Sequence, residues 1–345
     1  MAHRSMTKQK LASVSFVMPV LNEETYLRYA VESILTQDFD GPVEVILALG
    51  PSTDDTNRIA AALVKEHESK HNVVTVENEA GNTSAGLNAA IRVAKHDVII
   101  RVDAHSKLSK NYTKLAVEIL NDTQAANVGG IMRAVGHSAF QQAVAFAYTS
   151  RVGLGGGAYH VGGEAGPADS VYLGVFRKQA LLDVGLFDEG IVRGQDWELN
   201  LRLRESGNVV WFDPRLEVEY HPRSDLKRLS KQFFDTGVWR GQLTRQKPGK
   251  ASLRYFAPPV LVVGSAACLL SIDYGFVLGE PSLTLAVIPL AAYFGLIFFS
   301  AFKAEKLNWA TRSNLMLVLP AMHYSWGAGF ILGFLRRVRQ SAKAA

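Results

Sequence analysis

Apolar and polar positions alternate along the first 130 residues as short apolar runs separated by longer amphipathic stretches. Four runs have the length of buried strands: Val14–Met18, Val43–Leu47, Val73–Val76 and Asp97–Val102. Between the first two, apolar residues recur at helical spacing: Leu27, Ala30, Val31, Ile34 and Leu35. Strands that alternate with helices predict an α/β fold, with a mostly parallel sheet and helices on both faces.

Polar residues suit the first turns of two further helices. Ser52 or Thr53 can cap a helix that begins at Asp54, because acidic residues favour the positive end of a helix. Asn82 is placed to cap another helix, which we expect to run through Ala94.

After Asn127 the alternation loosens. Eight glycines fall within residues 153–174, which is too many for a regular element and indicates a mobile loop. The elements expected beyond it are a helix, two short strands and a basic helix, at Gln195–Glu205, Val209–Phe212, Glu217–Tyr220 and Ser224–Arg245.

Three polar clusters follow the ends of the expected parallel strands: Pro19–Glu23, Gly50–Asp55 and Asp103–His105. Ligands of such sheets bind beyond the carboxyl ends of the strands. We therefore expect these clusters to meet at one edge and to form the ligand site.

The last third of the chain contains three long apolar runs, at residues 255–278, 281–302 and 313–335. Each reaches the ~20 residues needed to cross ~30 Å of hydrocarbon. The alternative is three buried helices of a soluble domain. Two of the runs are almost free of charge, which favours the membrane.

Charge and cysteine content indicate a cytoplasmic first domain. Met1–Lys10 is polar, so we expect no signal peptide, and the only cysteine, Cys268, lies in an apolar run. The net charge is +5, and nine Lys/Arg against two acids lie between Arg223 and Arg254. A basic segment before a membrane span is typical of the cytoplasmic face. We expect no nucleic-acid partner.

The third apolar run allows two membrane topologies. The turn at 279–282 has no basic residue and suits the outer face, whereas Lys303, Lys306 and Arg312 suit a return to the cytoplasm. A third crossing would place the basic tail 336–345 outside, against the positive-inside tendency. The run is 23 residues long, so we favour three crossings; the alternative is a segment that lies along the inner face.

Asp103-Ala104-His105 offers a carboxylate and an imidazole two residues apart. In an extended segment these side chains point the same way and can hold one cation. Such a cation can act as a Lewis acid on a diphosphate, and an imidazole ligand favours Mn²⁺ over Mg²⁺. Alone, the pattern is equally typical of a turn in which Asp103 caps the next segment. His221, after an apolar strand, is either a third ligand or a hydrogen-bonded surface histidine.

Several motifs in order and spacing resemble the family 2 glycosyltransferases, inverting enzymes of the GT-A fold, and within them the succinoglycan-type exopolysaccharide glucosyltransferases. The resemblance covers roughly residues 13–245. The segments that match the family include 17–24, 52–56, 85–91, 101–105, 172–177, 196–203 and the stretch from Gln232 to Arg240.

The resemblance implies roles for particular residues. Those that match donor contacts, or that could line the donor pocket, are Pro19, Leu21, Glu23, Asp54, Asn88 and Asp103. Asp103 and His105 match the metal motif, with Mn²⁺ or Mg²⁺ as the implied cofactor. Asp196 matches the general base. Gln232, Trp239 and Arg240 resemble an element that contacts the acceptor or the diphosphate.

Two positions depart from the family pattern. Leu49 stands where an Asp usually holds the base or ribose, so Asp54 or Asp55 would have to compensate. Gln195 replaces the usual Glu before the base. The loss of that negative neighbour implies that Asp196 ionises more readily than in the usual pair.

The sequence thus predicts a GT-A catalytic domain at 11–222, a basic juxtamembrane segment at 223–254, a membrane region at 255–335 and a basic tail at 336–345. The resemblance implies an inner-membrane, multi-pass enzyme that moves a hexose, glucose from UDP-glucose, onto a polyprenyl-diphosphate-linked sugar. Membrane lipids are further expected partners. The alternatives are a polyprenyl-phosphate sugar synthase, a processive synthase with too few spans to line a channel, and a non-catalytic membrane sugar-binding protein.

Overall fold

The computed structural model describes residues 12–67, 72–155, 157–191, 193–246 and 253–336. They form two compact units. The sheet unit comprises the described residues of 1–133 and 158–220, and the helical unit those of 134–157 and 221–345.

The sheet unit is built on a mixed sheet of nine strands, counted over the described residues. Its order is β3 (Asn72–Glu77), β2 (Val43–Leu49), β1 (Val14–Val20), β4 (Val98–Arg101), β8 (Tyr172–Arg177), β6 (Asn127–Ala134), β9 (Val210–Tyr220) and β5 (Ser106–Leu108), while β7 (Gly166–Pro167) pairs with β9. The pairs among β3, β2, β1 and β4 are parallel. The pairs of β8 with β4 and β6, and of β9 with β5 and β7, are antiparallel.

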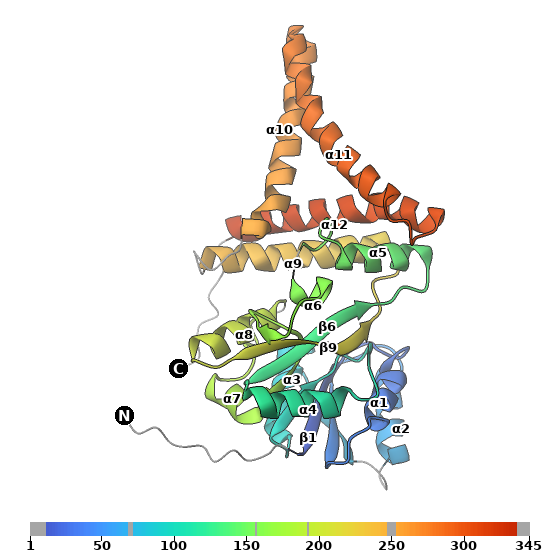
Figure 1. The fold of residues 1–345 in the computed structure, drawn as a ribbon, viewed down its shortest axis with the longest axis vertical. Coiled ribbons are helices and arrows are strands. Elements are labelled where there is room, and N and C mark those ends of the chain that lie inside the picture. Colours follow the sequence, from blue (N-terminus) through green and yellow to red (C-terminus); the bar gives the residue numbers. More distant parts are fainter. Residues whose placement is uncertain (1–11, 68–71, 156, 192, 247–252, 337–345) are drawn as a thin grey trace. The chain divides into compact units, whose positions relative to one another are not determined.

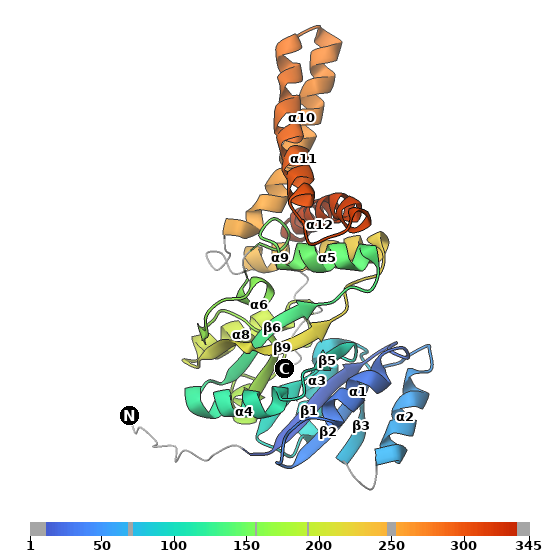
Figure 2. The ribbon, with the colours of Figure 1, turned by 45° about the vertical axis from the view of Figure 1, so that its right-hand side comes forward.

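Helices cover both faces of this sheet, as its alternating buried side chains require (Figure 2). Phe16 and Met18 face a core shared with α1 (Leu27–Leu35), α2 (Thr56–His67) and α4 (Tyr112–Thr123). Val17 points to the other face and belongs to a second core. The helices of this second core are α3 (Thr83–Val93), α7 (Lys178–Asp183) and α8 (Gln195–Glu205).

The pattern of strands and helices predicted for the first 130 residues is confirmed, and so are the Asn82 cap and the helix at Gln195–Glu205. Two details differ. The helix expected at Asp54 begins at Thr56, and the Asp54 carboxylate accepts from the Thr56 amide at 3.0 Å at the start of the helix.

The two short strands expected within 209–220 are also different, because Val210–Tyr220 forms one long strand, β9. The glycine-rich segment contains α6 (Ala158–Val161), β7 and the start of β8, so it is more ordered than a loop. β7 and β8 take hydrogen-bonded partners in the sheet, which a count of glycines does not reveal.

The helical unit places α9 (Leu226–Gln246), α12 (Trp309–Leu335) and α5 (Ala139–Thr149) side by side, across the base of a hairpin of α10 (Ala257–Leu278) and α11 (Val287–Phe302) (Figure 1). Short 3₁₀ helices, Leu253–Phe256 and Pro281–Ala286, precede α10 and α11. Residues 134–157, expected inside the first domain, belong to this unit, because the rings of Tyr148 and Phe233 pack at 5.9 Å and Thr311 donates to Gln142 at 3.1 Å.

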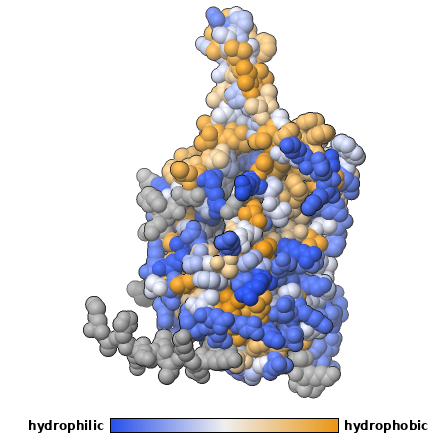
Figure 3. All heavy atoms as spheres, viewed as in Figure 1, coloured by the Kyte–Doolittle hydropathy of each residue, from blue (hydrophilic) through white to orange (hydrophobic). Residues whose placement is uncertain are grey.

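Among the described residues, three helical segments are long and apolar enough to cross a membrane: Leu253–Leu278, Pro281–Phe302 and Trp309–Leu335. In the first two, large apolar side chains point outward, and Leu270 and Phe276 are 70% and 74% exposed. Apolar atoms gather on the hairpin and on the helices at its base in the view of Figure 3. The third segment is different, because 39% of its apolar window is buried in the protein, against 6% and 11% for the others.

Glycines bring α12 into backbone contact with α9. Gly237 and Gly241 on α9 face Gly329 and Gly333 on α12, and a Cβ atom at any of the four would collide with the opposite backbone. Small residues four apart are a common device for close helix packing in membranes. Here, however, α9 is strongly basic, carrying Lys227, Arg228, Lys231, Arg240 and Arg245.

This packing predicts two crossings instead of three. A helix bound along a highly charged partner cannot be enclosed by lipid, because Lys or Arg at the bilayer centre costs ~2.5–3.5 kcal/mol each on insertion scales. We expect a reporter fused after Ala345 to lie on the same side as one fused before Met1, with a reporter in the 279–282 turn on the opposite side. A C-terminal reporter on the side of that turn would restore the three-span topology.

Candidate active site

The parallel strands β1, β2 and β4 end together, so the loops that follow them meet at one edge of the sheet. In the register, Val17 on β1 lies opposite Arg101 on β4, and Val20 lies opposite Leu49 on β2. The three expected polar clusters therefore converge, as strand polarity predicts.

Hydrogen bonds join the loops after β1 and β2. Asn22 adopts a left-handed backbone conformation (φ 55°), and its side-chain oxygen accepts from the Thr53 amide at 2.8 Å. Its own amide donates to the Ser52 hydroxyl at 3.0 Å, and the Glu23 amide donates to the Thr56 hydroxyl at 2.7 Å. The two loops thus form one fixed surface beyond the sheet.

The expected donor-binding residues occupy different settings. Leu21 is 38% exposed at this edge, and Pro19 lies below it, closely approached by Gly86. Asp54 lies just before α2, and hydrogen bonds from the Thr56 side chain and amide hold the pKa of Asp54 below its usual value. Asn88 is buried and exchanges hydrogen bonds with the backbone of Phe187 at 2.8 and 3.0 Å, so the contacts it makes here are structural.

Arg101 lies at the centre of the site and bridges two carboxylates. Its side chain is only 5% exposed; Nη2 donates to Asp103 at 3.0 Å and Nη1 donates to Asp196. Asp103 follows β4, whereas Asp196 lies in the first turn of α8. One buried guanidinium therefore brings together the expected metal ligand and the expected base, 93 residues apart in sequence (196 − 103).

The two carboxylates have opposite pKa shifts. Burial alone would raise the pKa of Asp103, but the charges of Arg101 and His105 and the Arg101 hydrogen bond outweigh it, so this pKa is lowered. Burial raises the pKa of Asp196; Arg101 opposes the shift and Asp103 reinforces it, which leaves the pKa above its usual value. The Asp196 side chain is 35% exposed, so solvent moderates the effect.

His105 is held by Glu23 at the same edge. Its Nδ1 lies 2.9 Å from the Glu23 carboxylate, and its ring packs edge-on against Tyr220 at 5.9 Å. If Nδ1–H donates to Glu23, the lone pair of the imidazole is on Nε2. A carboxylate behind a histidine in this way fixes the ring and raises its basicity as a metal ligand.

Asp103 and His105, the pair expected to bind a metal, lie close enough for the His105 charge to act on the Asp103 carboxylate. Within the described residues, no group of three or more His, Cys, Asp or Glu side chains could hold an ion. His221 belongs to the helical unit, where its ring stacks on His137 at 5.1 Å and its Nδ1 lies 3.4 Å from the Val135 oxygen.

The residues expected to contact the acceptor or diphosphate lie on α9. The Gln232 amide donates to the Tyr148 hydroxyl at 3.2 Å. The Arg240 guanidinium lies over two aromatic rings, 4.4 Å from the centre of Trp239 and 4.2 Å from that of Tyr255. The flat guanidinium is thereby held in a fixed orientation.

Two residues of this site were not singled out from the sequence. Arg101 is the only charged residue of β4, and a buried cation needs an anionic partner, which was the available signal. Tyr172 has no comparable signal in the sequence. Its hydroxyl is buried near Asp103. Burial and then the Asp103 charge raise the pKa of Tyr172 well above its usual value, so it remains a hydrogen-bond donor.

These features define a GT-A-like domain with a carboxylate–imidazole pair and a second carboxylate at the ligand-binding edge, followed by helices fit to enter a membrane. Residues 15–183 match the profile of Glycosyl transferase family 2. The chain belongs to this family and is a glycosyltransferase.

Two relatives of known role are similar to most of the chain. It is 30% identical over 345 residues to the succinoglycan biosynthesis protein ExoA of Rhizobium meliloti (strain 1021), covering 96% of this chain and all of the relative. It is 26% identical, over 68% of this chain and 74% of the relative, to dolichyl N-acetyl-alpha-D-glucosaminyl phosphate 3-beta-D-2,3-diacetamido-2,3-dideoxy-beta-D-glucuronosyltransferase of Methanococcus voltae.

A solved structure supports the fold. The mannosyltransferase PcManGT from Pyrobaculum calidifontis, in complex with GDP-Man and Mn²⁺, superposes with a TM-score of 0.56 at 17% identity, covering 91% of this chain and 86% of the other. S. aureus TarS 1-349 in complex with UDP-GlcNAc superposes with a TM-score of 0.50 at 15% identity, covering 93% of this chain and 89% of the other.

Proposed function

We propose that this chain is an inverting, metal-dependent hexosyltransferase of exopolysaccharide or cell-surface glycan assembly. It moves glucose from UDP-glucose onto a sugar linked to a polyprenyl diphosphate, at the cytoplasmic face of the membrane. The observation that carries the proposal is the Arg101 bridge, which sets Asp103 and Asp196 beside each other at the sheet edge.

In this reaction the acceptor hydroxyl oxygen attacks the anomeric carbon, and the bond from that carbon to the diphosphate breaks on the opposite face. Asp196 takes the hydroxyl proton, and UDP leaves with the bonding electrons. The raised pKa of Asp196 suits this role, because a base works best with a pKa closer to the operating pH. Single displacement of this kind inverts the anomeric configuration.

A divalent cation fits the residues present. The lowered pKa of Asp103 keeps it ionised, and Glu23 fixes the orientation of the His105 ring. When bound, such an ion neutralises charge on the leaving diphosphate. A carboxylate and an imidazole leave other positions for phosphate oxygens and water, and the mixed donor set favours Mn²⁺ over Mg²⁺.

A lipid-linked acceptor is supported by the apolar helices and by the Methanococcus voltae relative, whose name describes a dolichyl-linked glucosaminyl phosphate. Direct transfer onto polyprenyl phosphate is the alternative. A phosphate oxygen needs little help from a base, so the place of Asp196 beside Arg101 favours a hydroxyl acceptor.

Membranes that contain the protein test the proposal. They are incubated with radiolabelled UDP-glucose, UDP-galactose, UDP-GlcNAc or GDP-mannose, with Mn²⁺ or with EDTA. We expect lipid-extractable label from UDP-glucose in Mn²⁺, and mild acid should release it in an oligosaccharide. Release as a single labelled sugar would favour the polyprenyl-phosphate synthase, and equal transfer in EDTA would refute metal dependence.

A further inference from the structure

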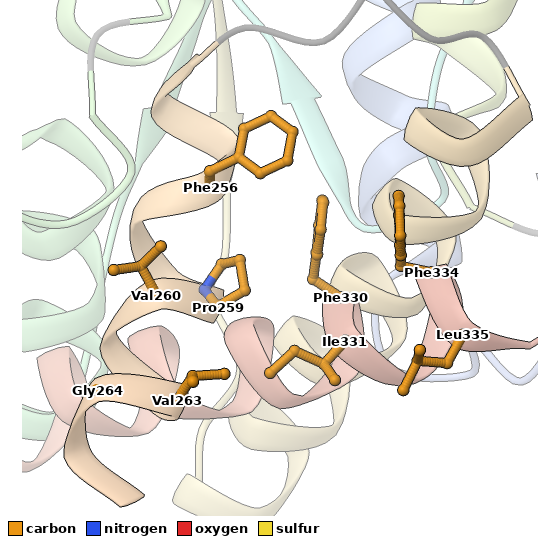
Figure 4. Close-up of a pocket in the computed structure, with 9 residues that line it drawn as sticks. All are labelled: Phe256, Pro259, Val260, Val263, Gly264, Phe330, Ile331, Phe334 and Leu335. Atoms are coloured by element: carbon orange, nitrogen blue, oxygen red, sulfur yellow. The ribbon is translucent and has the colours of Figure 1, made fainter. Parts of the chain in front are cut away.

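An apolar groove runs between the start of α10 and the end of α12, with a volume of about 510 Å³ (Figure 4). Phe256, Pro259 and Val260 form one side, and Phe330 and Phe334 form the other. All of its lining side chains are apolar. Gly264 also lines it, and a Cβ atom there would meet nothing within 4 Å, so a missing side chain keeps this part open.

Packed aromatic rings hold the groove in shape. Phe256 meets Phe330 edge-on at 5.6 Å, and Phe330 stacks on Phe334 at 6.2 Å. Just before the groove opens, Gly327 on α12 approaches the Pro258 carbonyl so closely that a side chain would collide with it. The two helices therefore touch at Gly327 and leave a gap beyond it. The groove therefore differs from the exposed side of α10, which any lipid can contact.

Cations lie at the rim. Tyr255, next to Phe256, carries the Arg240 guanidinium at 4.2 Å and the Arg254 guanidinium at 5.1 Å from its ring centre. Arg245 donates to the carbonyl oxygens of Phe334 and Leu335 at 3.3 and 3.4 Å. An apolar groove with arginines at its rim is complementary to a lipid with a phosphate head, because the apolar side chains suit the tail and guanidinium groups bind phosphate oxygens in pairs.

We propose that this groove holds the first isoprenoid units of the lipid-linked acceptor, with its phosphates at Arg240 and Arg254. This inference rests on the proposed function, which supplies a polyprenyl acceptor. The tail gains packing in the groove, and little hydrophobic energy, because the bilayer is itself apolar. The groove therefore fixes the position of the tail, and the arginines supply most of the selectivity for the anionic head.

The test uses the full chain in phosphatidylcholine nanodiscs and two photoreactive probes: a polyprenyl phosphate with a diazirine near its head, and a phosphatidylglycerol with a diazirine in its acyl chain. We expect the polyprenyl probe to label peptides that contain residues 256–264 or 330–335. Unlabelled polyprenyl phosphate should compete, and excess phosphatidylglycerol should not. Equal labelling by both probes would mean that the groove holds bulk lipid, and would overturn the inference.

Gly264→Leu fills the groove, and Gly295→Leu is its matched control, since both glycines lie in apolar helices with no atom within 4 Å of the added Cβ. We expect Gly264→Leu to lower polyprenyl labelling about fivefold through lost packing, with Gly295→Leu unchanged. Unchanged labelling in Gly264→Leu would place the tail elsewhere.

Wild-type transfer to lipid, measured in parallel, separates the two failures. Sugar transfer without labelling of the groove would refute only the inference that the groove holds the acceptor tail. Labelling of the groove without transfer to a lipid-linked sugar would refute the proposed function.

Discussion

Asp196→Asn is expected to lower the turnover of sugar transfer by about 10²–10⁴-fold while donor binding stays nearly unchanged. Loss of a positioned general base typically costs this much. The amide keeps the size of the carboxylate and can still meet Arg101, but it cannot accept the acceptor proton. Single-turnover transfer of labelled sugar, with nucleotide affinity measured separately by calorimetry, gives both quantities.

Asp169→Asn provides the control. Asp169 is also a carboxylate of the sheet unit, but its side chain is 85% exposed and pairs with Arg204 at 3.1 Å. We expect wild-type turnover from this variant. If nucleotide affinity in Asp196→Asn fell in step with turnover, Asp196 would be a binding or structural residue and its role as base would be wrong.

Arg101→Met is expected to move the acidic limb of the pH–rate profile to higher pH by about 1–3 units. A neighbouring cation lowers the pKa of a carboxylate by this amount, and the variant removes that cation. Asp196 must be ionised to accept a proton, so activity falls as the pH drops through its pKa. That pKa is already raised, and Arg101 opposes the rise. Without Arg101 the pKa of Asp196 rises further, so activity is lost at the acidic end of the profile and is retained at alkaline pH.

Recovery at alkaline pH separates this electrostatic role from a structural one. Arg177→Met is the matched control, because Arg177 also lies in the sheet but donates to the carbonyls of Ala125 and Leu120 at 3.0 and 2.6 Å. It should lower thermal stability and leave the acidic limb in place. Arg101→Lys keeps the positive charge, so its acidic limb should lie between those of the wild type and Arg101→Met. An unshifted limb in Arg101→Met would contradict the proposed coupling.

The parallel half of the fold could be predicted from the sequence because its signals are local. The apolar run at Val14 and the Asn82 cap each depend on neighbours within a few residues. The convergence of the loops after β1 and β4 then follows from strand polarity alone. The family resemblance added the roles that we propose for Asp103 and Asp196.

The rest depends on contacts between distant segments. The Arg101–Asp196 pair spans 95 residues, and neither residue alone indicates the other. The pairing of His105 with Glu23 spans 82 residues and gives Glu23 an orienting contact that a nucleotide-loop motif does not suggest. In the same way, hydropathy identified the apolar run before Leu335, but could not show that its glycines pack against a charged helix.

The insertion of residues 134–157 into the helical unit has a practical consequence for isolating the enzyme. A chain cut before α10 would still contain α5 and α9, but it would lose α12, whose Thr311 hydroxyl donates to Gln142 and whose His323 meets the Val152 oxygen at 2.8 Å. The glycines of α9 would then face solvent in place of a partner helix. We therefore expect C-terminal truncation before α10 to expose the α9 surface that α12 covers, so a catalytic fragment has to keep α12.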